Sequence, residues 1–556
     1  MRLATAALVV VCSAFAYWIG LRQGLAASIS PPSYRQLTFR GGTIRMARFA
    51  PDGKSIVYSA AWEGNPVELF VNRPESPESR PFGLKGAEVL SVSSSGEMAV
   101  LLNSRNIDPY INEGTLGRVP LGGGAPREVL EHVEWADWSP DGNNLVVVRE
   151  SLGQSQIEYP VGKVIYRTGG WISHPRISPQ GDQIAFVEHP LRRDDAGNVM
   201  LLSLSGKAKL LSTGWETVWG LAWPPSGSEI WFTGTKIGYG RYLAAVSLSG
   251  KERLLAREPG TLTLQDVARD GHVILTRDVP RVGMVGVASG ESKERDLSWL
   301  DWSAPRDLSS DGKILLFTES GEGGGENYSA YMRTTDGAPA IRLGEGYAIA
   351  LSPDKKWVLA GLPKTPLQFS LLPTGAGESK PVTHDQINHG IAHWLPNGTG
   401  FVFAGNAPNE GVKLYAQSLD GGTPRAFTPE GVNPSLFAIS PDGKSVVAVG
   451  PDQQGYSYPI DGSSPRLLAG FDPGDGPITW SADGQSVYIY RLGELPVKVY
   501  RLDLSSGKKQ FWKSLMPPDL SGVTDISAIY ITPDGRGYVY EYGRTLSDLY
   551  LVADIK

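Results

Sequence analysis

The chain has 556 residues, a formal net charge of −6 and 41% hydrophobic residues, which is the composition of a globular protein and excludes wholesale disorder. Its 67 glycines and 41 prolines are spread along the sequence, which indicates many short strands and tight turns and argues against a helical bundle. Because no long basic run accompanies the acidic balance, we expect no nucleic-acid partner.

The N-terminal segment predicts a membrane anchor. Residues 3–21 carry no charge, and as a helix they would nearly span a hydrocarbon core of about 30 Å. We expect residues 1–27 to form a single-pass anchor in the cell inner membrane, with the N-terminus in the cytoplasm and the rest in the periplasm or extracellular space. A cleaved signal peptide is the alternative, because residues 25–27 resemble a cleavage site. The single cysteine, Cys12, lies in this segment and excludes an intramolecular disulfide.

The rest of the chain is an internal repeat. A four-residue turn, in its commonest form Ser-Pro-Asp-Gly, recurs at intervals of 39 to 51 residues. Its twelve copies occupy residues 50–53, 93–96, 139–142, 178–181, 224–227, 268–271, 309–312, 352–355, 395–398, 440–443, 481–484 and 532–535. Proline presets the backbone of such a turn, Asp bonds the local backbone, and Gly takes the positive-φ position, so each copy predicts a hairpin.

Each turn is followed by an apolar run typical of a strand, as at residues 144–150, 229–234 and 486–491. A third strand with a small turn comes next, as at 242–251, and a short fourth strand ends the unit, as at 253–256. Four strands per period of about 40–45 residues are the signature of a β-propeller blade. The predicted fold class is therefore all-β.

Twelve blades exceed the usual ring of four to eight, so we predict two tandem β-propellers of about six four-stranded blades each. The first propeller would span residues 28–292 and the second residues 293–556. Residues 34–39 resemble a fourth strand, and we expect them to close the first ring against the third strand near 282–289. By the same reasoning, 294–298 would close the second ring against 549–552. The alternatives are a division into seven and five blades, and a cross-closure in which residues 34–39 pair with the C-terminal strand.

The turn motifs resemble those of the PD40 or TolB-type subfamily of WD40-like propellers, over residues 34–556. Segments 261–278, 293–317, 321–346 and 544–552 further resemble the extracytoplasmic propeller half of bacterial membrane-bound serine/threonine protein kinases. In that family a kinase domain precedes the transmembrane helix, whereas here the apolar segment begins at residue 3. The resemblance implies a sensor or binding domain, and an alternative is that the catalytic domain is missing or encoded upstream.

No catalytic constellation stands out in the sequence. The chain lacks the His-Arg-Asp and Asp-Phe-Gly motifs of kinases, and the Gly-rich run 321–325 lacks the last glycine of a nucleotide-binding loop. The Gly-x-Ser-x-Gly motif of α/β-hydrolases is also absent, so a propeller-containing hydrolase is a weaker alternative. We therefore expect no enzyme activity, no catalytic residue and no cofactor.

Five residues are candidates to face a ligand. Trp171 and His174 enter the innermost strand of the fourth blade, where side chains reach the central channel. His384, His389 and His393 cluster within ten residues, and imidazoles bind transition metals. In a strand, however, His389 and His393 would lie about 13 Å apart, so we predict no metal site.

The sequence as a whole predicts a membrane-anchored extracytoplasmic β-propeller that acts as a binding, sensing or protein-interaction module. Its expected partner is an unknown protein, peptide or glycan ligand in the cell envelope. No motif identifies that ligand.

Overall fold

The computed structural model describes residues 32–555 except 74, 77, 109, 152–153, 191–193, 363, 365, 409 and 492. This part of the chain is built from β-strands and one short 3-10 turn, η1 (Glu322–Gly324), which confirms the predicted all-β fold. The predicted anchor, residues 3–21, lies outside the described residues. Within the described residues, no helix has the length and apolarity needed to cross a membrane.

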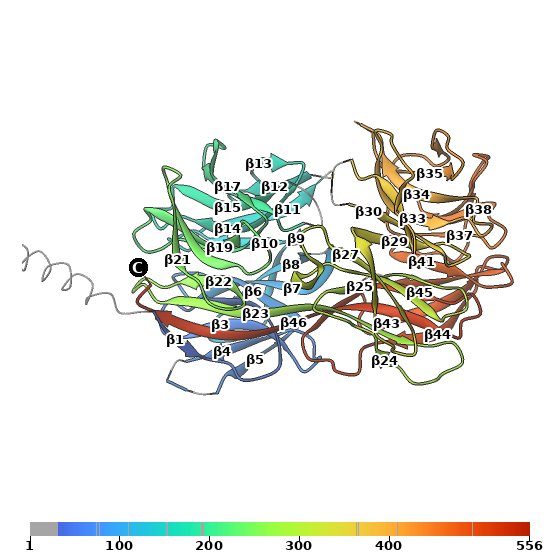
Figure 1. Ribbon diagram of the computed structural model, residues 1–556. Helices are drawn as coiled ribbons and strands as arrows, with labels where there is room; N and C mark the ends of the chain where they lie inside the picture. Colours follow the sequence, from blue (N-terminus) through green and yellow to red (C-terminus); the bar gives the residue numbers. More distant parts are fainter. Residues whose placement is uncertain are drawn as a thin grey trace, which may run out of the picture.

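Five four-stranded antiparallel sheets make up most of a first lobe (Figure 1). The first sheet contains β2 (Gly42–Phe49), β3 (Ile56–Trp62), β4 (Glu68–Asn72) and β5 (Arg80–Lys85). The second contains β6 (Ala87–Val92), β7 (Glu97–Asp108), β8 (Ile111–Pro120) and β9 (Arg127–Val133). The third contains β10 (Trp135–Trp138), β11 (Leu145–Ser151), β12 (Gln154–Glu158) and β13 (Val164–Thr168). The fourth contains β14 (Trp171–Ile177), β15 (Gln183–His189), β16 (Gly197–Ser203) and β17 (Ala208–Trp215). The fifth contains β18 (Thr217–Ala222), β19 (Glu229–Thr235), β20 (Tyr242–Ser247) and β21 (Glu252–Ala256).

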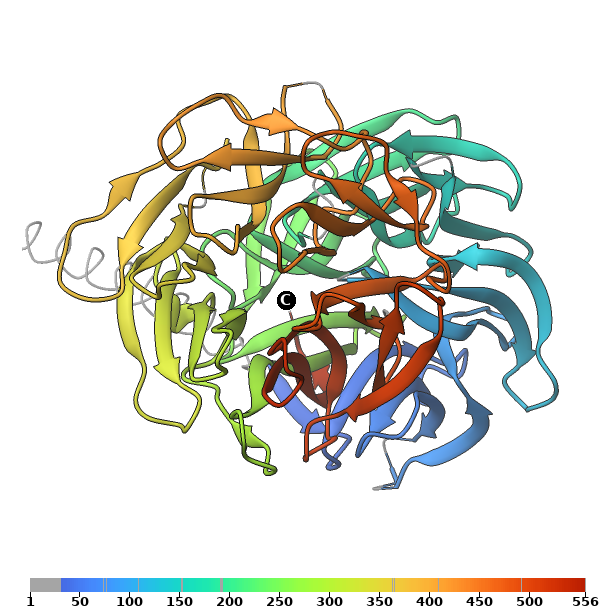
Figure 2. The same ribbon diagram turned by 90° about the vertical axis from the view of Figure 1, so that its right-hand side faces the viewer.

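Five more such sheets make up most of a second lobe, arranged around a central axis in Figure 2. The first contains β25 (Ser303–Leu308), β26 (Ile314–Glu319), β27 (Ser329–Thr334) and β28 (Ile341–Glu345). The second contains β29 (Tyr347–Leu351), β30 (Trp357–Gly361), β31 (Phe369–Pro373) and β32 (Lys380–Pro381). The third contains β33 (Asn388–Trp394), β34 (Gly400–Asn406), β35 (Lys413–Ser418) and β36 (Arg425–Ala426). The fourth contains β37 (Phe437–Ile439), β38 (Ser445–Val449), β39 (Gly455–Pro459) and β40 (Arg466–Leu467). The fifth contains β41 (Asp475–Trp480), β42 (Ser486–Arg491), β43 (Val497–Asp503) and β44 (Lys509–Leu515).

The predicted turns join the first and second strands of these sheets. At residues 139–142, the Gly142 N–H donates to the Ser139 carbonyl at 2.8 Å, and Gly142 has a φ of 72°. The Asp141 carboxylate accepts the N–H of Asn143 at 3.1 Å and the hydroxyl proton of Ser139. The turn therefore satisfies its own polar groups, as the repeated residue types predict.

The sheets pack face to face around each axis, with their first strands innermost. In the first lobe β2, β6, β10, β14, β18 and β22 (Thr261–Val267) contact one another in that order, and β22 returns to β2. In the second lobe β25 contacts β29 and β29 contacts β33, while β37, β41, β45 (Val523–Ile531) and β25 form a further chain of contacts. Apolar side chains fill the spaces between neighbouring sheets, as Val402 of β34 and Phe437 of β37 do. Repeated four-stranded antiparallel sheets in this arrangement fit a β-propeller.

Two long strands join the lobes. β23 (Val273–Val287) and β46 (Tyr538–Ala553) pair antiparallel along their whole length and run from one lobe into the other (Figure 1). In the first lobe they lie between β22 and β1 (Ser33–Gln36), and in the second lobe they lie between β45 and β24 (Arg295–Asp296). One six-stranded sheet therefore completes both lobes.

The expected closure of the two rings is wrong, and the alternative pairing of the first strand with the C-terminal strand is the one observed. β1 pairs with residues 550–553 of β46, whereas β24 pairs with residues 285–286 of β23. The third strand of the first lobe's closing sheet is therefore the C-terminal part of β46, and the third strand of the second lobe's closing sheet is the C-terminal part of β23. Each lobe thus takes its third strand from a chain segment that begins in the other lobe. The reason is local: no turn interrupts residues 278–284 or 542–546, so each of these segments stays extended and continues into the other lobe. The predicted division of the chain at residue 292 stays a prediction, but paired strands cross it.

Tryptophans directly before the turns donate hydrogen bonds to backbone carbonyls of the neighbouring sheet. The indole N–H of Trp480 donates to the Ala438 carbonyl at 3.0 Å, and that of Trp394 donates to the Ala350 carbonyl at 3.2 Å. Trp223 bonds the Arg176 carbonyl in the same way, at 2.9 Å. These contacts agree with the packing that the recurrence of tryptophan at one phase of the repeat indicates.

We expect Trp480→Phe to lower the free energy of unfolding by about 1–3 kcal/mol, because it leaves a buried carbonyl without its donor. Trp299→Phe is the control, since Trp299 is 40% exposed. Urea denaturation of both variants measures the difference. Equal losses in the two variants would contradict this role of the indole.

Candidate functional site

The residue two places before each turn occupies what we call the axial position. In the first lobe the axial residues are Arg48, Ser91, Asp137, Arg176, Ala222 and Asp266. All of them except Ala222 line one pocket of about 470 Å³. The pocket also includes the turns of the same repeats, so it lies at the end of the first lobe where the turns meet.

The axial side chains bond each sheet to the next. Ser91 Oγ accepts the N–H of Trp138 at 3.2 Å, and Asp137 Oδ2 accepts the N–H of Ile177 at 2.9 Å. Asp266 Oδ2 accepts the N–H of Phe49 at 3.0 Å and so connects the sixth repeat back to the first. These bonds hold the walls of the pocket in fixed positions.

Arg176 bridges two of the carboxylates. Its Nη1 lies 3.2 Å from Asp137 Oδ1, and its Nη2 bonds Asp266 Oδ1. Arg176 and Asp137 are 8% and 7% exposed, so these ion pairs are shielded from water. Burial disfavours the charge of Arg176, but Asp266 and Asp137 outweigh this effect and raise its pKa above the ordinary value.

Arg48 has a different environment. Its Nε donates to the Leu90 carbonyl at 2.7 Å, and its Nη1 donates to the carbonyls of Ala47 and Gln265. Burial and the nearby Arg176 guanidinium lower the pKa of Arg48 to about 9, against the opposing effect of the two carboxylates. Arg48 is thus a buried cation held by neutral carbonyls.

The axial positions of the second lobe are less charged. They are Asp307, Ala350, His393, Ala438, Thr479 and Tyr530. Asp307 repeats the bond between sheets, because its Oδ2 accepts the N–H of Leu351 at 2.8 Å. Burial raises the pKa of Asp307 to about 7, although its bonds to Leu351 and Leu308 favour the carboxylate.

Asp307 predicts a pH dependence of stability. The pKa of the Asp307 carboxyl is near 3.8 in the unfolded chain and about 7 in the folded protein. The free energy of unfolding therefore falls by roughly 4 kcal/mol between pH 4 and pH 7, because the carboxyl ionises first in the unfolded chain. The folded pKa is raised, so this contribution is present at low pH and disappears as the pH rises. We expect Asp307→Asn to remove that decline and to be more stable than the wild type at pH 8. Urea denaturation at several pH values measures it, and parallel profiles for wild type and variant would contradict it.

Two of the predicted ligand-facing residues, Trp171 and His174, lie together at the opposite end of β14 from the turn. Trp171 is 1% exposed, and its ring stacks on His189 with centroids 3.7 Å apart. The His174 ring lies 4.2 Å from Trp135 and 4.8 Å from Trp219. This end of the first lobe is therefore packed with aromatic rings.

Hydrogen bonds fix the tautomers of both histidines in this aromatic cluster. The Gly220 N–H donates to His174 Nε2, which leaves Nδ1–H of His174 to donate to Ser173 Oγ at 2.9 Å. Ser173 then donates to His189 Nε2 at 2.8 Å, and His189 Nδ1–H donates to the Ala196 carbonyl. Burial lowers the pKa of His174 well below its ordinary value, so the ring is neutral at pH 7.

The other three predicted residues are in the second lobe and are not brought together. His384 is exposed in the loop between β32 and β33. His389 is 2% exposed, stacks on Phe403, and bonds Asp385 through Nε2 at 3.0 Å. His393 is at an axial position, and burial lowers its pKa to about 4. Among the described residues, no group of three His, Cys, Asp or Glu side chains could hold a metal ion.

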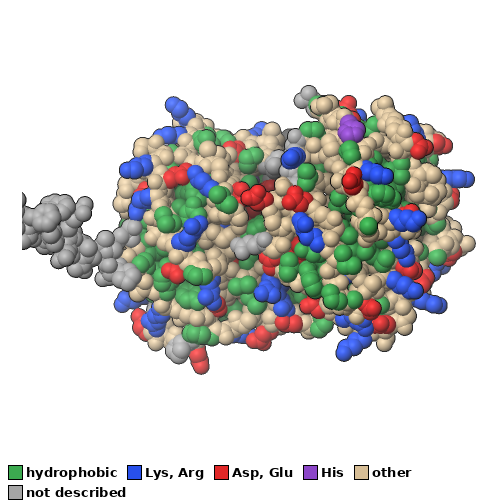
Figure 3. All heavy atoms as spheres, in the orientation of Figure 1, with side chains coloured by type: hydrophobic (Ala, Val, Ile, Leu, Met, Phe, Trp, Pro, Cys, Tyr) green, Lys and Arg blue, Asp and Glu red, His purple; other side chains and the backbone are tan. Residues whose placement is uncertain are grey.

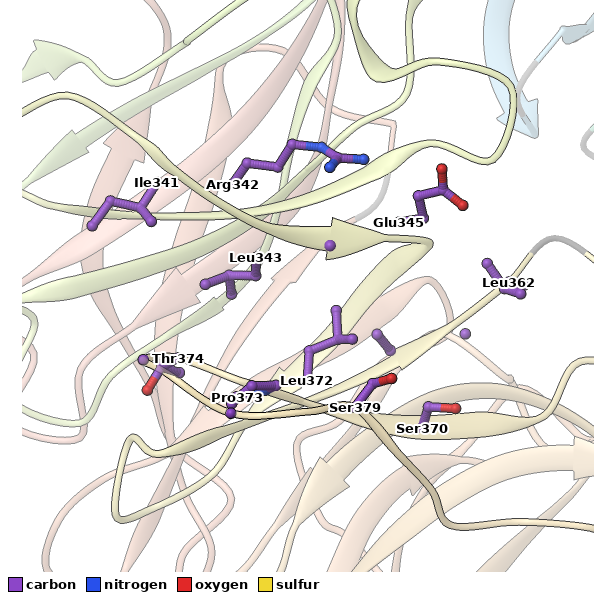
Figure 4. A pocket seen from close by; sticks show the side chains of 15 residues that line it. Ile341, Arg342, Leu343, Glu345, Leu362, Ser370, Leu372, Pro373, Thr374 and Ser379 are labelled. Carbon is purple, nitrogen blue, oxygen red and sulfur yellow. The ribbon is translucent and has the colours of Figure 1, made fainter.

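A second cavity of about 580 Å³ lies between β28 and β31 in the second lobe. Figure 4 shows Leu343 and Leu372 at its wall and Arg342 and Glu345 on one side. Ile341 is 57% exposed at its edge. This cavity is a groove of mixed apolar and polar walls between two neighbouring sheets, and its charged lining residues, Arg342 and Glu345, are exposed.

The axial residues Arg48, Asp137, Arg176 and Asp266 were not among the residues singled out from the sequence. A signal for them exists, because they occupy one position relative to a turn that recurs through the chain. Reading that position down the repeats gives two arginines and two aspartates in the first lobe. Charged residues in an apolar strand at a fixed phase of a repeat indicate a shared polar site.

Comparisons with known proteins leave the family of this chain open. No family model matches it. A stretch of 198 residues is 28% identical to the uncharacterized peptidase YuxL of Bacillus subtilis (strain 168). That stretch is 33% of this chain and 28% of YuxL, so the chain spans well under two thirds of that relative.

Solved structures that align with this chain include several proteins of different activities. TolB from Acinetobacter baumannii has 12% identity and a TM-score of 0.24, over 74% of this chain and 80% of TolB. The tricorn protease has 15% identity and a TM-score of 0.32, over 92% of this chain and 58% of its own. The GH74 xyloglucanase from Xanthomonas campestris has 10% identity and a TM-score of 0.36, over 92% of this chain and all of its own. The resemblances to the PD40 subfamily and to the kinase-linked propellers stay predictions.

Proposed function

We propose that this protein is a binding module composed of two closed β-propellers of six blades each, and that it is not an enzyme. The single observation that carries the proposal is the axial pocket of about 470 Å³, whose charged walls are held in place by bonds between successive sheets. Pockets of this size are typical of small-molecule and peptide sites, and a preorganised wall lowers the entropic cost of binding.

The proposed setting is the cell envelope. The apolar segment 3–21 would anchor the chain in the inner membrane, and both propellers would lie in the periplasm or extracellular space. The ligand would be a protein, peptide or glycan of that compartment. Figure 3 shows basic and acidic side chains interspersed over one face of the molecule, which favours recognition by a local pocket over attraction to one broad charged surface. Reporter fusions at the C-terminus test this orientation, and a cytoplasmic signal would overturn it.

The binding function is tested against catalysis with the purified full chain. We expect a serine-reactive fluorophosphonate probe to label no serine saturably and a panel of peptides to remain uncleaved. Saturable labelling of one serine together with peptide cleavage would overturn the proposal.

A peptidase is the second candidate function, and the match to YuxL is the observation that favours it. The same experiment distinguishes the two candidates. A peptidase would show turnover that a point substitution of the labelled serine removes, whereas a binding module would show saturable binding without turnover.

A further inference from the structure

We propose that the axial pocket of the first lobe binds a carboxylate group through Arg48. This inference rests on the proposed binding function and adds to it the chemical class of the ligand. The carboxylate could belong to the end of a peptide or to a small organic acid, and the experiment below separates these two sources.

The first argument is the difference between the two arginines of the pocket. Arg176 is matched by two carboxylates, Asp137 and Asp266, which it contacts directly. Arg48, by contrast, has no carboxylate oxygen within ion-pair distance in the described part of the chain, and its oxygen contacts are the carbonyls of Leu90, Ala47 and Gln265. Arg48 is 6% exposed, so water replaces the missing anion poorly.

The second argument is unused hydrogen-bonding capacity. Arg48 Nη2 donates to Met46 Sδ at 3.6 Å, and a thioether is a weak acceptor. The N–H groups of Nε and Nη1 are used by the three carbonyls, so Nη2 is the nitrogen of Arg48 that can donate to a ligand carboxylate. A hydrogen bond from a guanidinium to a carboxylate is charge-assisted and stronger than one to a thioether.

The third argument is that the nearby acceptors are already committed. Asp137 accepts bonds from Ser91 Oγ at 2.7 Å, from Arg176 and from the Ile177 N–H. Asp266 accepts from Arg176 and from the Phe49 N–H. Turning either carboxylate toward Arg48 would break bonds that connect successive sheets, so a carboxylate partner for Arg48 has to come from outside the chain.

The pocket itself offers a place for that acceptor. Arg48 and Arg176 line the same volume of about 470 Å³, and the indole of Trp223 and the ring of Trp138 lie in its wall. Burial, followed by the nearby Arg176 guanidinium, lowers the pKa of Arg48, and a bound carboxylate would offset the repulsion between the two guanidiniums. The tryptophans provide an optical signal for binding.

The test uses the full chain in detergent and three probes: tri-alanine with a free carboxylate, tri-alanine amide, and acetate. Calorimetric titration and tryptophan fluorescence measure binding. We expect saturable binding of the free acid and at least tenfold weaker binding of the amide. If acetate competes with the free acid at similar concentration, the pocket takes a small acid. If acetate binds at least tenfold more weakly, the pocket takes a peptide end.

Two variants locate the site. Arg48→Gln should weaken binding of the free acid at least tenfold, whereas Arg40→Gln, which removes an exposed charge of the same lobe outside the pocket, should change it less than threefold. Circular dichroism checks that each variant is folded, and Arg48→Lys replaces Arg48→Gln if the latter unfolds. Binding without preference for the free acid, no saturable binding, or equal losses in the Arg48 and Arg40 variants would overturn the inference. Failure of the proposed function would appear separately, as fluorophosphonate labelling with turnover.

Discussion

A fragment that starts at residue 292 is expected not to fold on its own, although it contains six of the twelve repeats. The closing sheet of the second lobe needs residues 280–287 of β23, which lie between β46 and β24. Met284, Val285 and Val287 are at most 3% exposed there. Losing three buried apolar side chains removes about 5–9 kcal/mol, which is comparable to the whole stability of a domain.

A matched pair of fragments tests this exchange of strands. Residues 280–545 contain the four strand segments that close the second lobe, which belong to β45, β46, β23 and β24. Residues 292–545 lack the segment of β23. We expect a cooperative thermal transition and near-ultraviolet circular dichroism from 280–545 and neither from 292–545. A cooperative transition in both fragments would contradict the need for the exchanged strand.

The second large effect is expected from Arg176→Met. This substitution leaves the buried Asp137 and the partly buried Asp266 without the cation that joins them, and breaking a buried ion pair by removing one partner costs about 3–5 kcal/mol. Without the cation, two negative charges remain close together in a site that water reaches poorly. Urea denaturation at pH 8 measures the loss.

Two further variants make the Arg176 experiment specific. Arg40→Met removes an ion pair whose side chains are 51% and 61% exposed, and we expect a loss below about 1 kcal/mol. Adding Asp137→Asn and Asp266→Asn to Arg176→Met removes the unpaired charges and should restore part of the stability at pH 8. No restoration would mean that packing, and not charge, accounts for the loss.

Local chemistry accounts for what the sequence predicted correctly. The turns at residues 139–142 and their counterparts are specified by Pro, Asp and Gly at fixed places, and their bonds stay within five residues. The alternation of turns and apolar runs then requires four-stranded antiparallel sheets. The repeated tryptophans before the turns follow from the same periodicity, since a residue at one phase meets the same neighbour in each repeat.

The sequence identified Trp171 and His174 as a pair near the axis, and the structure places them together in the aromatic cluster of the first lobe. It also grouped His384, His389 and His393 by proximity along the chain. Those three residues diverge because His384 is in a loop, while His389 and His393 are separated by an irregularity in β33. Residues that are close in the sequence of an extended strand therefore need not bring their side chains together into one site.

By itself, the sequence determined the all-β fold, the repeat and the position of each turn, because these depend on contacts within one unit. Only the tertiary structure decided how the lobes close and which residues meet at the axis. β1 can pair with either β23 or β46 as far as local preference is concerned, and the choice depends on strands more than 500 residues apart. Likewise, Arg48, Arg176 and the two aspartates come from separate repeats, and only closure of the ring brings their shared position before each turn together in one pocket.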